Sequence, residues 1–291
     1  MSAQSIYRSS DGAAEIMALY DRVLAKSPVL SEQGEILTRH GATFILATGD
    51  PSSPPIVLLH GSASNAASWL GEMAALGEHY RVYAVDIPGE PGKSSRARFS
   101  WEGDAFVEWL DDVLDGLNLT RSVLGGMSLG GWATLRYAID RPARVIAAIA
   151  ICPSGVVPPR MTFVLRMVGY TMLGAWGRRR MIRSIFNGAE IPSDLEQFMI
   201  LVDRHFRYRT GAPPLFTDAE LQSLVMPVLF LAGENDVLLD TPKTATRLRR
   251  LIPDLTVHIS AEDGHAVLGN APAIAAFLDA QLAGAATPEC A

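Results

Sequence analysis

Short apolar runs recur along the chain and alternate with amphipathic stretches. Runs rich in Val, Ile and Leu that are bounded by Gly, Pro or Asp are typical of buried parallel strands. Six such runs occur: PPIVLLHG, YRVYAVDIPG, RSVLGGMS, RVIAAIAICPSG, MPVLFLAGEND and LTVHISAEDGH. Helical periodicity separates them, most clearly where Phe106, Leu110, Val113 and Leu114 fall on one face. This alternation predicts a mostly parallel sheet with helices on both faces.

Two segments precede the first of these strands. Residues 34–50, GEILTRHGATFILATGD, alternate around a His40-Gly41 turn. This pattern predicts an antiparallel hairpin, which brings the expected sheet to eight strands. Residues 12–28, GAAEIMALYDRVLAKSP, show the spacing of an amphipathic helix that ends at Pro28. We therefore expect residues 1–30 to form an N-terminal accessory helix.

Residues 155–217 interrupt the alternation of strands and helices. They are rich in Met, Phe and Arg and have helical rather than strand periodicity. A chain of 291 residues suits one large α/β core, so we expect residues 1–291 to form a single domain with residues 155–217 inserted as a helical cap. Apolar cap residues at helical spacing serve either packing or a substrate pocket. The candidates for the pocket are Phe163, Met167, Met172, Trp176 and Phe186.

Composition narrows the classes of partner. The net charge of −6 and the isoelectric point near 5.5 give no basic footprint, which argues against binding to nucleic acid. Charged side chains punctuate the first 30 residues, so neither a signal peptide nor a membrane span is expected, and the protein is expected in the cytoplasm. Cys152 and Cys290 suit neither a disulfide nor a metal site and are expected to be free thiols. We expect a small-molecule substrate, with no metal or other cofactor; the oligomeric state is left open.

The stretch GGMSLGGW carries the first candidate for chemistry. Residues 126–130 read G-x-S-x-G between a predicted strand and a predicted helix. In this context a serine occupies a tight turn that holds its Oγ out of the sheet. Ser128 is therefore a candidate nucleophile, and the backbone N–H of Leu129 lies where a helix N-terminus favours negative charge.

A serine hydroxyl needs a base within hydrogen-bonding reach and a third group that orients the base. Side chains that follow the carboxyl ends of parallel strands meet at one edge of the sheet. His265 follows a predicted strand at that edge, whereas His258 lies inside a strand, His79 and His205 fall on predicted helices, and His40 is at a turn. Two aspartates follow the preceding strand, Asp236 and, four residues later, Asp240. Asp236 is preferred because it lies nearer the strand end, and Asp240 is the alternative.

The loop after IVLLH supplies a further element of the site. It reads His60-Gly61-Ser62-Ala63-Ser64-Asn65. The backbone N–H groups of Ser62 and Leu129 could together stabilise an oxyanion. We interpret His60 as a hydrogen-bonded structural histidine of this loop rather than as a catalytic group.

The chain resembles the α/β-hydrolase superfamily through LLHGSASN, VDIPGEPGKSS, GGMSLGGW, GENDVL and DGH. Among its members it is most similar to small bacterial carboxylesterases with a helical cap, and DIPGEPGKSS is similar to their variant of the more usual D-x-P-G-x-G-x-S loop. The resemblance implies the α/β-hydrolase fold, with Ser128 as nucleophile, His265 as general base and acid, and Asp236 as the orienting carboxylate. Ser62 and Leu129 would form the oxyanion hole by their backbone N–H groups.

The implied activity is hydrolysis of carboxylic esters of a small, largely apolar substrate through an acyl-enzyme. Two alternatives are compatible with the same motifs. One is a C–C bond hydrolase or perhydrolase that uses the same triad, because the pocket decides the substrate. The other is a non-catalytic ligand-binding protein that has kept the fold.

Overall fold

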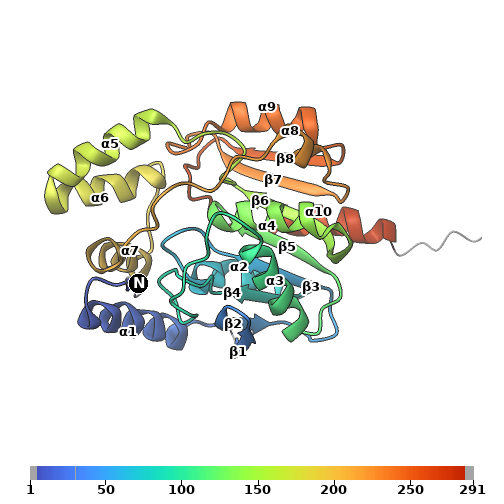
Figure 1. Cartoon of the computed structure of the whole chain (residues 1–291), viewed down its shortest axis with the longest axis horizontal. Helices are drawn as coiled ribbons and strands as arrows, with labels where there is room; N and C mark the ends of the chain where they lie inside the picture. The colour runs from blue at the N-terminus through green and yellow to red at the C-terminus, as the bar shows by residue number, and fades with distance from the viewer. Residues whose placement is uncertain (1–4, 30, 286–291) are drawn as a thin grey trace, which may run out of the picture.

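An eight-stranded sheet forms the centre of the molecule in the computed structural model, which describes residues 5–29 and 31–285 (Figure 1). The strand order across the sheet is β1-β2-β4-β3-β5-β6-β7-β8. The strands are β1 (Glu32–Thr38), β2 (Gly41–Thr48), β3 (Pro55–Leu59), β4 (Arg81–Val85), β5 (Ser122–Met127), β6 (Val145–Ile151), β7 (Val228–Gly233) and β8 (Leu255–Ser260).

The sheet is antiparallel at one edge and parallel elsewhere. β1 pairs with β2 and β2 with β4 in antiparallel fashion, whereas β4, β3, β5, β6, β7 and β8 run parallel. The predicted hairpin and the six predicted parallel strands are thus confirmed. Gly41 opens β2 with φ +104°, a conformation that L side chains rarely adopt, which explains a glycine at this tight turn.

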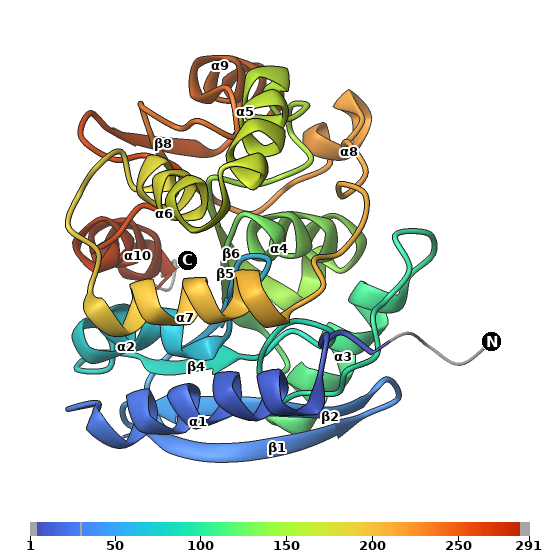
Figure 2. The same ribbon diagram turned by 90° about the vertical axis from the view of Figure 1, so that its left-hand side faces the viewer.

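Helices cover both faces of the sheet. In Figure 2, α2 and α10 lie on one side of β5 and β6, and α3 and α4 lie on the other. The helices are α1 (Ser10–Lys26), α2 (Leu70–Leu76), α3 (Ala105–Gly116), α4 (Leu129–Asp140), α5 (Met161–Met172), α6 (Gly174–Ile185), α7 (Ser193–His205), α8 (Asp218–Gln222), α9 (Thr241–Leu251) and α10 (Ala271–Ala285), with 3-10 turns η1 (Ala66–Trp69) and η2 (Pro142–Arg144). Among the described residues, no helix is both long enough and apolar enough to cross a membrane.

Two clusters of buried side chains hold these elements together. The larger one fills the space between the sheet and its helices, and β4, β6 and β7 contribute almost entirely buried residues to it. The smaller one joins α1 to α7 through side chains that include Ile16, Leu19, Phe198 and Val202. Residues 6–8 extend this contact, because Arg8 donates its backbone N–H to His205 O at 2.8 Å.

Residues 155–217 connect β6 to β7 and contain α5, α6 and α7. α5 and α6 pack against each other and project beyond the sheet, whereas α7 returns to lie beside α1 (Figures 1 and 2). The N-terminal segment contains α1, and residues 1–4 and 30 of that predicted element lie outside the described residues. Cys290, predicted to be a free thiol, also lies outside them.

Candidate active site

Ser128 occupies the turn between β5 and α4 with φ 53° and ψ −106°. A non-glycine residue with this backbone is strained, at a cost of roughly 1–3 kcal/mol, and such strain clusters at functional sites. The turn is held in place because Ser128 donates its N–H to Ile151 O at 2.8 Å and accepts from Trp132 N–H at 3.0 Å. Its neighbours must be glycines: a Cβ at Gly126 would overlap Gly130, and a Cβ at Gly130 would overlap the carbonyl oxygen of Leu59.

The loop that follows β3 lies beside this turn. A Cβ at Gly61 would lie 3.6 Å from the Cβ of Ser128, so the backbone next to Ser62 runs close to the serine. Leu129 is buried and is the first residue of α4. The structure therefore brings the two predicted oxyanion-hole segments to the same serine.

His60 is fully buried beneath this loop. Ile87 donates its backbone N–H to Nε2 of His60 at 2.9 Å, so the proton of the neutral ring is on Nδ1, which donates to Gly61 O at 2.8 Å. Burial lowers the pKa of His60 to about 4. These are the contacts of a neutral structural histidine that shapes the loop.

His265 and Asp236 form a buried pair at the carboxyl ends of β8 and β7. Nδ1 of His265 lies 2.8 Å from Oδ2 of Asp236, and the two residues are 7% and 1% exposed. The other oxygen of Asp236 accepts the backbone N–H groups of Leu238 at 2.7 Å and Leu239 at 2.9 Å.

Several groups hold Asp236 ionised. Burial raises the pKa of its carboxyl, but the hydrogen bond and charge of His265 and the two backbone N–H groups lower that pKa more. The net pKa of Asp236 is therefore below its usual value, as a carboxylate that orients an imidazole requires.

Asp240, the alternative acid, has different contacts. Its side chain caps α9 by accepting the backbone N–H of Lys243 at 3.1 Å, and it forms an ion pair with the Lys243 ammonium at 3.2 Å. Arg160 lies 3.9 Å from it on the other side. The carboxylate that the structure brings to His265 is thus that of Asp236.

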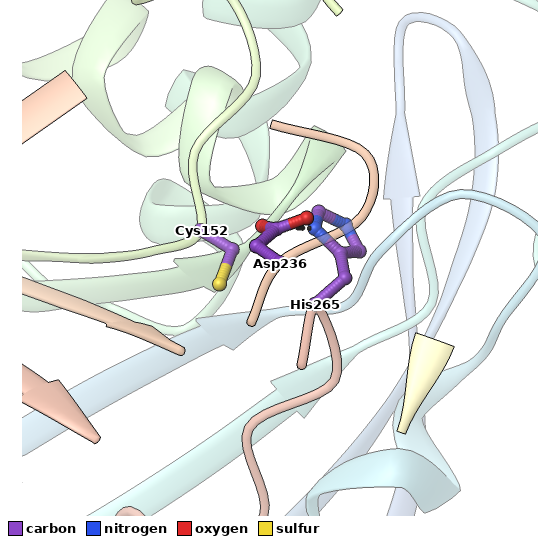
Figure 3. Close-up of side chains that lie close together, drawn as sticks. All are labelled: Cys152, Asp236 and His265. Carbon is purple, nitrogen blue, oxygen red and sulfur yellow. Dashed lines mark hydrogen bonds and ion pairs between the residues drawn. The ribbon is translucent and has the colours of Figure 1, made fainter. Parts of the chain in front are cut away.

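Cys152 lies on the far side of Asp236 from His265 (Figure 3). It follows β6 with φ 42°, and it is buried. Burial and the negative charge of Asp236 raise the pKa of the thiol. The sequence analysis assigned Cys152 no role beyond that of a free thiol, yet its place directly after a parallel strand, as for Ser128, was a signal that it lies at the same edge of the sheet.

The same three side chains are the residues to consider for a metal ion. Among the described residues, Cys152, Asp236 and His265 have potential ligand atoms within 4.8 Å of one another. However, the carboxylate is already shared between imidazole and backbone donors, and a thiol whose pKa is raised is a poor ligand because metals bind the thiolate. The geometry suits a proton-transfer pair better than a cation.

Glu90 is a second residue of the site that the sequence did not single out. It is buried, and its Oε2 accepts the backbone N–H of Ala63 at 2.6 Å. Ala63 has φ 59°, so this hydrogen bond secures a strained position one residue after Ser62. Burial raises the pKa of Glu90 to about 7, against the opposing charges of Arg209 and Arg98. The sequence signal that could have identified Glu90 is the stretch GEPG, residues 89–92, which differs from the more usual loop pattern.

The five predicted pocket residues lie on α5 and α6 or directly after α6. Met172 and Trp176 are 84% and 65% exposed on α5 and α6, and Met167 is also exposed. Phe163 is half-buried, and Phe186 is buried at the end of α6. A cavity of about 590 Å³ lies elsewhere, between α1, α2 and α7, and none of the five lines it. Helical spacing identifies an apolar stripe but not the neighbour that the stripe faces.

Known proteins resemble this chain over most of its length. A sequence model of the alpha/beta hydrolase family matches residues 56–277. The uncharacterized carboxylesterase nap of Bacillus subtilis is 31% identical over 272 residues, which cover 90% of each chain. Carboxylesterase YbfK of the same organism is 31% identical over 84% of this chain and 86% of its own. The crystal structure of naproxen esterase from Bacillus subtilis, 29% identical, matches with a TM-score of 0.81 over 92% of this chain and 96% of that one.

Proposed function

Because this chain belongs to the alpha/beta hydrolase family, we propose that it is a carboxylesterase-type serine hydrolase whose substrates are small, largely apolar esters. Relatives and a solved structure that are named as carboxylesterases and match nearly the whole chain support ester hydrolysis. The observation that carries the assignment of residues is the buried 2.8 Å hydrogen bond between His265 and Asp236, at the same edge of the sheet as the strained turn of Ser128.

In the proposed reaction, Oγ of Ser128 attacks the ester carbonyl while Nε2 of His265 takes its proton. Nδ1 of His265 hydrogen-bonds to Asp236. This bond keeps the ring proton on Nδ1, so that Nε2 is free to act as the base, and the carboxylate stabilises the imidazolium that forms. The backbone N–H groups of Ser62 and Leu129 stabilise the oxyanion. The tetrahedral intermediate then loses the alcohol, which leaves with the proton from His265.

Water completes the cycle by the same route. His265 takes a proton from water as its oxygen attacks the acyl-enzyme, and the proton returns to Ser128 when the carboxylic acid leaves. The residues named supply nucleophile, base, acid and oxyanion donors, so the reaction needs no cofactor. Residues 155–217 would act as the cap of a single catalytic domain that spans residues 1–291. The cytoplasmic location expected from the sequence stays a prediction.

Release of p-nitrophenol from acetate, butyrate and octanoate esters tests the proposal. The Ser128→Ala variant should lose at least about 10⁴-fold in kcat, because removal of the nucleophile leaves only binding and oxyanion stabilisation. Ser223→Ala is the matched control: it removes the same hydroxyl group from an exposed serine outside the proposed site, so near-full activity is expected.

Hydrolysis that persists in Ser128→Ala would overturn the assigned nucleophile. Wild-type protein that leaves all three esters intact but cleaves a dienoic C–C substrate would support the C–C hydrolase alternative instead. Protein that processes neither kind of substrate would point to the non-catalytic alternative.

A further inference from the structure

The cavity of about 590 Å³ is built from elements that are far apart in the sequence. α1 and α7 form one wall, and η1, α2 and the loop before α10 form the other. Figures 1 and 2 show α1 and α7 side by side, and the cavity lies between this pair and α2. A volume of this size falls within the range of pockets that hold ligands of drug size.

Two loops of the proposed catalytic machinery contribute to the wall. Ser64 and Asn65 belong to the loop that carries Ser62, and Leu268 and Gly269 follow His265 by three and four residues. The cavity therefore adjoins both the oxyanion loop and the histidine loop. The link between the cavity and the proposed triad is made by these two loops, since the triad residues themselves do not line the cavity.

The chemistry of the lining defines what fits. Val23, Leu70, Leu195 and Phe198 present apolar side chains to it, and none of the described lining residues is basic. Glu72 also lines it; burial raises the pKa of this glutamate, whose carboxyl accepts the backbone N–H of Asn270 at 3.3 Å. An apolar group is favoured there by burial, whereas a carboxylate would lose its hydration without meeting a cation.

We propose that this cavity binds the larger apolar group of the ester, and that α1 and α7 thereby select neutral esters with an extended apolar arm. This inference rests on the proposed function and adds the substrate class. It assigns specificity to the helix before the sheet and to the last helix of residues 155–217, rather than to α5 and α6.

Gly71 in α2 offers a sharp test because it lines the cavity and an added Cβ would meet nothing within 4 Å. Its φ is not in the left-handed region, so the Gly71→Phe side chain can occupy the cavity without backbone strain. Gly169 in α5 is the matched control, since it is also a helical glycine with nothing within 4 Å of an added Cβ. Gly169→Phe adds the same side chain outside the cavity.

We expect Gly71→Phe to lower kcat/KM for p-nitrophenyl octanoate by about 10-fold or more, while kcat/KM for p-nitrophenyl acetate changes by less than about twofold. The reason is that the long arm loses several buried CH₂ contacts, each worth about 0.8 kcal/mol, or roughly fourfold. Gly169→Phe should leave kcat/KM for both esters unchanged.

The wild type should also prefer the neutral octanoate to the p-nitrophenyl ester of adipic acid, whose free carboxylate would lose its hydration in an apolar cavity that offers no cation. Equal effects of Gly71→Phe on both chain lengths, or the same effect from Gly169→Phe, would overturn the proposal.

A binding measurement separates this inference from the proposed function. Titration calorimetry of octan-1-ol into Ser128→Ala measures the cavity without any turnover. In the double variant Ser128→Ala/Gly71→Phe, octan-1-ol binding should be at least 10-fold weaker than in Ser128→Ala. In Ser128→Ala/Gly169→Phe it should be unchanged. If Ser128→Ala remains active but octanol binding follows this pattern, the proposed nucleophile fails and the cavity stands; unchanged octanol binding contradicts the cavity whatever the esterase result.

Discussion

At the scale of single residues, Asp236 and Asp240 lie in one loop, but their contacts give the two carboxylates different roles. Asp236 is buried, and its oxygens receive an imidazole and two backbone N–H groups. Asp240 is partly exposed, and its carboxylate oxygens contact the backbone N–H and the ammonium group of Lys243 in the first turn of α9. Only the first arrangement orients a base, so replacement of each carboxylate should have a different consequence.

Asp236→Asn should lower kcat by roughly 10³–10⁴-fold, because an amide in place of the carboxylate favours the wrong tautomer of His265. Asp240→Asn should keep near-full activity, and since Asn is as good an N-cap as Asp, unfolding free energy should change by less than about 1 kcal/mol. Steady-state kinetics and urea denaturation of both variants check this. Full activity in Asp236→Asn would contradict the proposed acid.

Glu90 is a residue whose charge depends on pH near neutrality. Burial raises the pKa of its carboxyl from 4.5 to about 7, so folding favours the protonated form. The stability that protonation contributes is fully present below the unfolded pKa of 4.5 and is lost as pH rises through 7. Above pH 7 the folded protein holds a buried carboxylate that accepts the Ala63 N–H.

Glu90→Gln removes this ionisation while leaving an oxygen that can accept from Ala63. The unfolding free energy of the variant, relative to wild type, should therefore rise by roughly 2 kcal/mol between pH 5 and pH 8. Denaturation curves at both pH values measure the difference. Glu78→Gln, at an exposed glutamate, is the control and should show no such trend. A Glu90→Gln difference that stays constant with pH would refute the linkage.

At the scale of elements, the turn from β5 into α4 depends on how closely backbone segments approach. Gly130 in the first turn of α4 lies against the end of β3, where a methyl group would overlap the carbonyl oxygen of Leu59. The same strand end leads directly into His60 and Ser62. Packing at Gly130 therefore positions the nucleophile and the oxyanion loop together.

Gly130→Ala should lower the unfolding free energy by roughly 3 kcal/mol, because backbone must move to accept the methyl group. Its kcat should fall as well, since the displaced strand end carries the oxyanion loop. Gly71→Ala is the matched control: in a helix with open space it should stabilise by about 0.5–1 kcal/mol. Thermal denaturation and ester kinetics test both variants. A Gly130→Ala variant with unchanged stability and kcat would argue against the close approach of Gly130 to the carbonyl oxygen of Leu59.

At the scale of the whole molecule, α1 and α7 form a unit with its own buried cluster. Ile16 is fully buried in this cluster and not in the larger one. Tyr20 connects the unit to the sheet, since its hydroxyl donates to the buried carboxylate of Asp86 at 3.0 Å. We expect the α1–α7 unit to open before the sheet does, because separate clusters open with separate free energies.

Ile16→Ala should lower the stability of this unit by about 2–4 kcal/mol through the cavity it creates. Hydrogen exchange measured by mass spectrometry should show faster exchange in α1 and α7 with unchanged protection in β5, β6 and β7. Ile149→Ala in β6 is the counterpart in the larger cluster and should speed exchange throughout the sheet. Uniform loss of protection in Ile16→Ala would show that the two clusters unfold as one.

The sequence by itself determined the strands, the hairpin and the order of the candidate triad. These features follow from local causes: β-branched runs predict strands, and parallel strands place Ser128, Asp236 and His265 at one edge of the sheet. The glycines around Ser128 are equally local, since the turn itself demands them.

Only the tertiary structure decided between Asp236 and Asp240, placed Cys152 and Glu90 beside the site, and located the apolar cavity. The periodicity of α5 and α6 suggested pocket residues, but periodicity gives the apolar face of a helix and not its neighbour. Whether two side chains meet depends on loops and on helix packing between segments far apart in the chain. That long-range geometry is what joins α1 to α7 and forms a cavity that no single stretch of sequence encodes.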